Sequence, residues 1–96
     1  MSFRKDDAGK LRFDLIDHEF EAELAAVLTH GASKYADNNW QNAEPVEAKA
    51  RYYAAFRRHV LAYLRGESID PDSGCPHLVC AACSLLFLRW FERNSK

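Results

Sequence analysis

Three carboxylates are crowded into one short polar segment of the sequence. Glu67, Asp70 and Asp72 lie within six residues, in the stretch ESIDPDSG, and His77 follows five positions after Asp72. Carboxylates this close together repel one another unless a cation neutralises them. Hard divalent cations such as Mg²⁺ and Mn²⁺ prefer oxygen ligands of this kind. The segment is therefore either a metal site or an acidic turn that simply faces water.

The residues that precede this segment favour the metal site. His59, Tyr63 and Glu67 are spaced by four and four, which places them on one helix face that points toward the acidic turn. A single histidine on an apolar face is more often a core residue, but Glu67 continues the same stripe. Arg58 and Arg65 flank this face, and guanidinium groups bind phosphates through paired hydrogen bonds. Metal ions and arginines together are typical of a site that holds a polyphosphate.

Further cations and a candidate base pocket lie nearer the N-terminus. Lys10 and Arg12 belong to a charged arm, and Lys34 lies in the string GASKY. In the string NNW, the Asn39 amide can pair with a base edge and Trp40 can stack on a base. The alternatives are a solvated basic arm and a turn anchored by its tryptophan, and the residue types alone leave both open.

Four soft or borderline metal donors form a second, competing cluster. Cys75, His77, Cys80 and Cys83 fall within nine residues. Three of them would lie on one helix, whereas structural zinc sites usually take their ligands from two separated pairs. Buried cysteines also substitute for small apolar residues in helix packing. A zinc-stabilised fold is therefore a minor alternative, and it predicts unfolding on chelation.

Helices must position these candidate residues. Apolar residues at three- and four-residue intervals, together with capping residues, predict three helices after an extended N-terminal arm. The first predicted helix begins after its cap Asp17 and ends near Gly31 or Tyr35. The second begins at Pro45 and is ended by Gly66, and the third begins at Pro76 and runs to Arg93. The last of these is apolar almost all round, so it needs neighbours on several sides. We predict an all-α fold of residues 1–96, a compact bundle of about three main helices completed by homo-oligomerisation as a dimer or tetramer.

Composition and charge narrow the classes of protein that fit. The 96 residues are 48% hydrophobic, which suffices for one packed domain and argues against intrinsic disorder. A net charge of −1 lacks the basic excess that nucleic-acid binding needs. The longest apolar run, Leu78 to Leu88, is too short to cross a membrane. Three cysteines without a secretion signal indicate reduced thiols and a cytoplasmic location.

The order of the motifs resembles a known enzyme family. The strings KLRFDLI, GASKY, NNW, RRH, GESIDPDSG and PHL follow one another and nearly span residues 10 to 88. This order resembles the MazG-like nucleotide pyrophosphohydrolases of phages and bacteria, and more closely their dATP/dGTP diphosphohydrolase branch. The arrangement GExxDxxSGxxH, with RH upstream, is the most specific part of the resemblance.

The resemblance implies an all-α, usually oligomeric enzyme. It would use Mg²⁺ or Mn²⁺ to hydrolyse a nucleoside triphosphate between the α and β phosphorus atoms, releasing pyrophosphate. The implied metal ligands are Glu67, Asp70 and Asp72. The resemblance implies that His59 and His77 are metal ligands or orienting groups at the catalytic centre. Arg58 and Lys34, also counted as catalytic, would contact phosphate together with Lys10 and Arg12. The implied base-pocket residues are Asn39 and Trp40. Many members carry histidine where this chain has Cys80, so Cys80 is not counted among the expected site residues.

Two functional classes follow from these observations. The first is a pyrophosphohydrolase of a purine deoxynucleoside triphosphate, with dGTP favoured, acting in the host cytoplasm if the chain is phage-encoded. The alternative is a small non-enzymatic helical phage regulator or protein-binding module, in which the acidic turn is solvated. The alternative predicts no dependence on metal.

Overall fold

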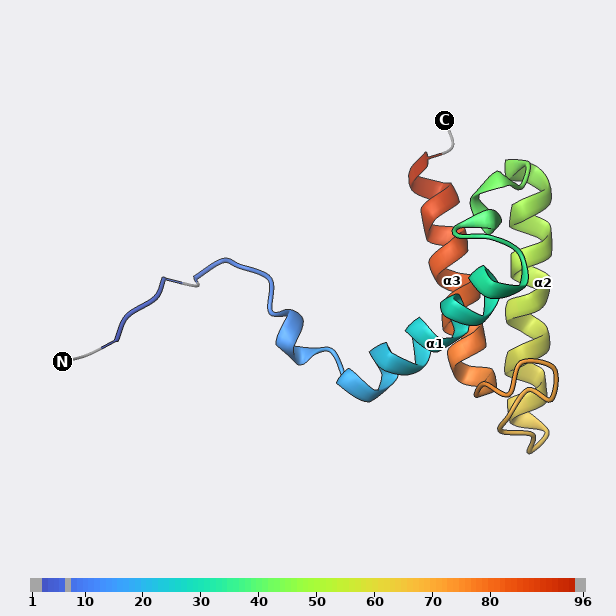
Figure 1. Cartoon of the computed structure of the whole chain (residues 1–96), viewed down its shortest axis with the longest axis horizontal. Helices are drawn as coiled ribbons and strands as arrows, with labels where there is room; N and C mark the ends of the chain where they lie inside the picture. Colours follow the sequence, from blue (N-terminus) through green and yellow to red (C-terminus); the bar gives the residue numbers. More distant parts are fainter. Residues whose placement is uncertain (1–2, 7, 95–96) are drawn as a thin grey trace.

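The fold of this chain is all-α. The structure, a computed structural model, describes residues 3–6 and 8–94 (Figure 1). Within them three helices follow one another, α1 His18–Lys34, α2 Pro45–Leu64 and α3 His77–Asn94. The short 3-10 helices η1 Phe13–Leu15 and η2 Asn39–Asn42 precede α1 and α2. The described residues contain no β-strand beyond an isolated bridge between Ile69 and Pro76, which confirms the predicted fold class.

The helices begin where their capping residues predict. The Asp17 side chain accepts a hydrogen bond from the Phe20 backbone N–H at 3.2 Å, which satisfies one free donor of the first turn of α1. Pro45 occupies the first turn of α2, where its missing N–H costs nothing. Pro76 directly precedes α3. All three predicted starts are therefore confirmed to within a residue.

Gly66 ends the second helix, as predicted: the last helical residue is Leu64, and Gly66 follows as a capping residue. The residue adopts a φ of 97°, in the left-handed region that favours glycine. Its N–H donates to the Tyr63 carbonyl, and the Glu67 N–H donates to the Ala62 carbonyl, both at 3.0 Å. This pair of bonds is the Schellman motif, which ends α2 and turns the chain toward α3.

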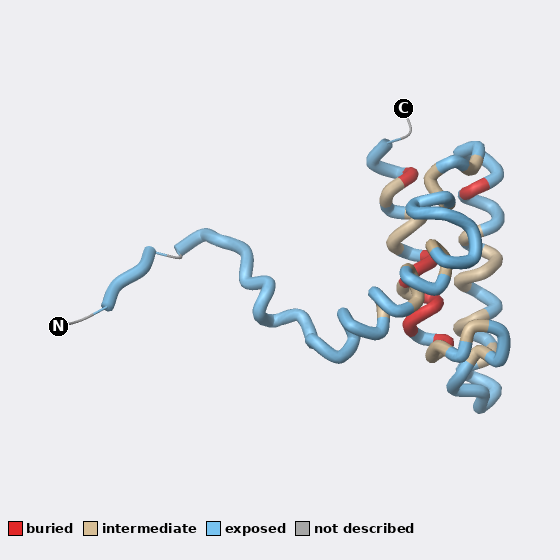
Figure 2. The backbone as a smooth tube through the Cα atoms, viewed as in Figure 1, coloured by how far each residue is buried: buried red, intermediate tan, exposed pale blue. Residues whose placement is uncertain are grey.

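The core lies between α2 and α3, which run side by side in opposite directions (Figure 1). Most buried positions belong to α3 (Figure 2). The ring of Trp40, in η2, stacks on that of Phe87 with 4.3 Å between centroids. The Tyr52 hydroxyl donates to the Trp40 carbonyl at 3.0 Å. An aromatic cluster thus fixes the loop between α1 and α2 onto the helical pair.

The first helix and the arm are much more open. All residues of α1 are exposed or half-buried, and only its C-terminal part lies against α3 (Figure 2). The arm before it extends away from the bundle, as predicted, with Phe3 90% and Leu11 81% exposed. Among the described helices, none combines the length and the apolar character needed to cross a membrane.

Candidate active site

The connection between α2 and α3 is a turn that is held together by hydrogen bonds between its own backbone groups. The Asp70 N–H donates to the Cys75 carbonyl and the Gly74 N–H donates to the Asp70 carbonyl, each at 2.8 Å. The His77 N–H donates to the Ser68 carbonyl at 2.8 Å. These bonds hold the acidic segment in one conformation, so the position of its side chains is set by the turn.

Two histidines and a glutamate form a chain of hydrogen bonds from the turn to α2. Nε2 of His77 lies 2.6 Å from Oε1 of Glu67, and Nδ1 of His77 lies 2.9 Å from Nδ1 of His59. A carboxylate only accepts hydrogen bonds, so His77 donates from Nε2. When both rings are neutral, His77 accepts at Nδ1 and His59 donates from Nδ1. His59 then keeps its lone pair on Nε2.

The next group of side chains joins Asp70 to α3. The Ser73 hydroxyl donates to Oδ2 of Asp70 at 2.8 Å and lies 3.8 Å from Sγ of Cys80. One ring nitrogen of His59, one carboxylate oxygen of Asp70 and the sulfur of Cys80 all lie within 4.8 Å of one another. Three separate segments, α2, the turn and α3, therefore contribute to one cluster.

Burial keeps the histidine of this cluster neutral. Burial lowers the pKa of His59 from its ordinary value of 6.5, and the neighbouring His77 and Arg58 lower it further while Asp70 opposes them. At neutral pH the metal-free protein therefore offers an uncharged imidazole at this position.

The other two members of the cluster have opposite shifts. For Asp70, burial raises the pKa, but the hydrogen bond from Ser73, the backbone N–H of Asp72 and the two nearby histidines outweigh burial and lower it. Burial raises the pKa of the Cys80 thiol. In the absence of a cation, Asp70 is therefore ionised and Cys80 is protonated at neutral pH.

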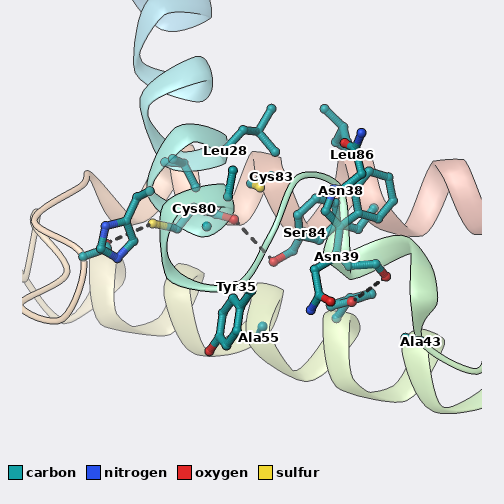
Figure 3. Close-up of a pocket in the computed structure, with 18 of the residues that line it drawn as sticks. Leu28, Tyr35, Asn38, Asn39, Ala43, Ala55, Cys80, Cys83, Ser84 and Leu86 are labelled. Carbon is teal, nitrogen blue, oxygen red and sulfur yellow. Dashed lines mark hydrogen bonds between the residues drawn. The ribbon is translucent and has the colours of Figure 1, made fainter.

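An open groove of about 1120 Å³ adjoins this cluster. Such a volume accommodates a small organic ligand. Figure 3 shows Asn38 and Asn39, from the loop after α1, on the same cavity as Cys80 and Ser84 of α3. The predicted site residues that line the groove are Asn39, Trp40, Arg58, His59 and Asp70. Residues far apart in the sequence are thus brought to one surface.

Other predicted site residues lie outside this groove. Glu67 contacts His77, and its side chain is 54% exposed, while Asp72 faces solvent. The three carboxylates therefore do not gather around one point, because the turn directs only Asp70 into the groove.

The predicted phosphate-binding cations of the N-terminal half do not line the groove either. Lys34, at the end of α1, lies over the Tyr35 ring at 5.3 Å from its centroid. Lys10 and Arg12 belong to the extended arm, and Arg12 pairs with Asp14 at 2.7 Å. No described residue of the arm lines the groove of its own chain. Figure 1 shows the arm leading away from the helices.

Trp40 lines the groove but also packs in the core. Besides the stacked Phe87 ring, the edges of Trp90 and Phe91 approach it, with centroid distances of 5.2 Å and 6.3 Å. A base could stack only on ring surface that these neighbours leave free. Base stacking on Trp40 stays a prediction, beside its evident role as an anchor of the loop.

The four-residue zinc cluster weighed from the sequence does not form. Of the described residues, only His59, Asp70 and Cys80 bring three metal-donor atoms together. Cys75 instead directs its sulfur toward the Ser73 carbonyl at 3.7 Å, and Cys83 is buried as a free thiol. The helix spacing that argued against this ligand set is the physical reason.

The sequence did not lead us to predict Ser73 or Cys80 beside His59 and Asp70. Cys80 follows His77 by three residues on a helix, a spacing that places both on one face, so this signal was available. Ser73 follows Asp70 by three residues in a turn, where a hydroxyl commonly bonds a neighbouring carboxylate. Neither signal indicates which partner from α2 completes the cluster.

Comparison with known proteins agrees with the resemblance seen in the motifs. The family model described as dATP/dGTP diphosphohydrolase, N-terminal, matches residues 2–96. The chain belongs to this family. A curated relative from Salmonella phage PMBT28, named dATP/dGTP diphosphohydrolase, is 38% identical over 90 residues. That match covers 94% of this chain but 30% of the relative, so the chain spans less than a third of the length of this family member. No solved structure matches the chain significantly.

Proposed function

We propose that this diphosphohydrolase-family chain hydrolyses a purine deoxynucleoside triphosphate, with dGTP favoured, to the monophosphate and pyrophosphate. The observation that carries the proposal is the groove, where Arg58, His59 and Asp70 meet the loop residues Asn39 and Trp40. Family membership and the name of the phage relative support the same reaction class. The groove thus combines groups suited to phosphate, metal and base at one place.

A divalent cation, Mg²⁺ or Mn²⁺, is part of this proposal. The donor set fits such an ion in part, because Asp70 is an ionised carboxylate on the groove while Glu67 and Asp72 lie on the same turn but outside it. Asp70 would hold the ion, and Mg²⁺ commonly completes its shell with water and phosphate oxygens. When bound, such an ion supplies activated water and neutralises developing phosphate charge.

The chain's own residues account for binding and orientation. Arg58 would pair with phosphate oxygens through its guanidinium group. Glu67 and His77 fix the ring of His59, so that a neutral imidazole nitrogen is held in one orientation beside Asp70. The Asn39 amide and the free surface of Trp40 would contact the base.

The homo-oligomer is also part of the proposal, as a dimer or tetramer. Apolar side chains remain exposed on the outer faces of α2 and α3, with Val46 76%, Leu64 70% and Leu85 49% exposed. Covering them would remove apolar surface from water. Lys10, Arg12 and Lys34 stay proposed phosphate contacts, and the arm of another subunit would supply Lys10 and Arg12. The free thiols of Cys75, Cys80 and Cys83 suit the reducing cytoplasm of a host cell.

A substrate survey tests the reaction. The protein is incubated with Mg²⁺ or Mn²⁺ and each nucleoside triphosphate in turn, and the products are separated by anion exchange. We expect dGMP and pyrophosphate from dGTP, and slower turnover of ribonucleotides and pyrimidines. Release of inorganic phosphate alone would contradict the reaction, and no turnover of any nucleotide would favour the non-enzymatic binding module.

A further inference from the structure

The cluster of His59, Asp70 and Cys80 contains a sulfur donor that a magnesium site does not need. Cys80 is buried on α3, yet it lines the groove with the other two residues. Thiolate sulfur and imidazole nitrogen suit zinc and similar ions, whereas Mg²⁺ takes oxygen ligands. We propose that His59, Asp70 and Cys80 form a binding site for a thiophilic divalent cation of the zinc and cobalt class.

The geometry of the cluster is close to what such an ion requires. Bonds of about 2.0 to 2.3 Å in a tetrahedral site place neighbouring donor atoms roughly 3.3 to 3.8 Å apart. The three donors already lie within 4.8 Å of one another, so each needs to move by roughly an ångström or less. Side-chain rotation alone provides movements of this size. The site is therefore largely formed before the ion binds.

Hydrogen bonds from neighbouring residues orient two of the three ligands, His59 and Asp70, for the ion. Histidine ligands usually donate their other ring N–H to a fixed acceptor. The Nδ1 contact from His59 to His77 at 2.9 Å, backed by Glu67, provides such a partner and leaves Nε2 of His59 available. The Ser73 hydroxyl donates to Oδ2 of Asp70 at 2.8 Å and the Asp72 backbone N–H donates to Oδ1 at 3.3 Å, which orients the carboxylate and leaves each oxygen a further lone pair for a metal.

Ligands from three separate segments distinguish this site from the cysteine-rich cluster that the sequence offered. His59 comes from α2, Asp70 from the turn and Cys80 from α3. Three protein ligands leave one tetrahedral position for water or substrate, as catalytic zinc sites do. On binding, the S–H bond of Cys80 breaks, a metal–sulfur bond forms, and one proton passes to solvent.

A metal ion at this site would add to the proposed function, but its binding does not require hydrolysis of a nucleotide. The ion would occupy the groove before substrate arrives, whereas Mg²⁺ can enter with the triphosphate it accompanies. The inference rests on the proposed function only for the meaning of the site, since metal binding is measurable without a nucleotide.

Cobalt provides the direct test. Co²⁺ is added to the full metal-free chain in a buffer with a phosphine reductant, and absorption is recorded through the near ultraviolet and visible range. We expect a sulfur-to-cobalt charge-transfer band and intense visible bands of four-coordinate cobalt, which excess Mg²⁺ does not remove. Circular dichroism checks that every variant keeps its helices.

Cysteine variants identify the ligand. Cys80→Ser should lose the charge-transfer band and bind Co²⁺ at least about tenfold more weakly, because even outer-shell changes cost about 10- to 100-fold. Cys83→Ser, one turn further along α3 and outside the cluster, is the matched control and should keep the band. Asp70→Asn should keep the band and weaken binding, which gives a second test if Cys80→Ser fails to fold.

Two outcomes would overturn the inference. The first is the absence of a charge-transfer band in the natural chain, and the second is its persistence in folded Cys80→Ser. Hydrolysis of dGTP with Mg²⁺ but no cobalt band would leave the proposed function standing without this site. A cobalt band without hydrolysis of any nucleotide would leave the site and refute the function.

Discussion

At the scale of single residues, the series of side-chain hydrogen bonds from Glu67 through His77 to His59 organises the site. His77 is only 4% exposed, and a buried imidazole needs partners for both ring nitrogens. Glu67 satisfies one and His59 satisfies the other. The same contacts that make burial of His77 tolerable therefore set the orientation of His59 beside Asp70.

The lowered pKa of His59 predicts how stability depends on pH. A histidine whose pKa is lower in the folded state binds fewer protons there than in the unfolded chain. The free energy of unfolding of the metal-free chain should therefore hold above pH 6.5, fall as the pH drops from 6.5 toward the lowered folded-state pKa, and level off below it. Urea denaturation at several pH values measures this. His59→Gln should flatten the dependence in that range, and an unchanged slope would contradict the assignment.

A second prediction concerns Trp40, because its ring packs in the core and also lines the groove. Trp40→Ala should lower the free energy of unfolding by about 3 kcal/mol, near the lower end for large aromatic truncations, since the ring is half-buried. Urea denaturation measures the loss, and Tyr35→Ala, at a residue that is 65% exposed, is the control. If Trp40 also stacks on the base, the KM for dGTP rises more than kcat falls. A loss no larger than that of the control would contradict the packing role.

At the scale of elements, the turn between α2 and α3 decides which predicted ligands meet. The starts of the helices were predictable from Asp17, Pro45 and Pro76, because capping and proline geometry act locally. The pairing of His59 with His77 was not predictable, since it depends on how α2 and α3 pack after the turn. Glu67 was predicted as a metal ligand from its charge, but the local turn gives its Oε1 atom to His77.

The Schellman cap at Gly66 leads to a prediction about the turn between α2 and α3. Gly66→Ala forces a side chain into the left-handed conformation, which costs about 1 to 2 kcal/mol of stability. The change should also loosen the Glu67 contact with His77. Gly31→Ala, within α1 and with open space around it, is the matched control and should be neutral or stabilise by up to about 1 kcal/mol. Urea denaturation of both variants measures this, and equal effects would contradict the account of the cap.

At the scale of the whole molecule, the chain has more apolar surface than its own helices cover. A second groove, of about 1030 Å³, lies between α2 and α3 and is lined by Val46, Tyr53, Leu85 and Leu88 among others. Light scattering should therefore give a mass above 11 kDa for the natural chain. Leu85→Glu should lower that mass by placing a charge in the apolar groove, while Glu92→Gln should not. A natural chain of 11 kDa in solution would contradict the proposed oligomer.

We propose that the groove hydrolyses a purine deoxynucleoside triphosphate, with Asp70 as its essential carboxylate. The most direct measurement is ³¹P NMR of dGTP incubated with Mg²⁺ or Mn²⁺ and either the natural chain, Asp70→Asn or the exposed control Asp72→Asn. The account predicts resonances of dGMP and pyrophosphate with the natural chain, their absence with folded Asp70→Asn, and a milder loss with Asp72→Asn. Equal hydrolysis by the natural chain and Asp70→Asn, or inorganic phosphate as the only new phosphorus product, would contradict it.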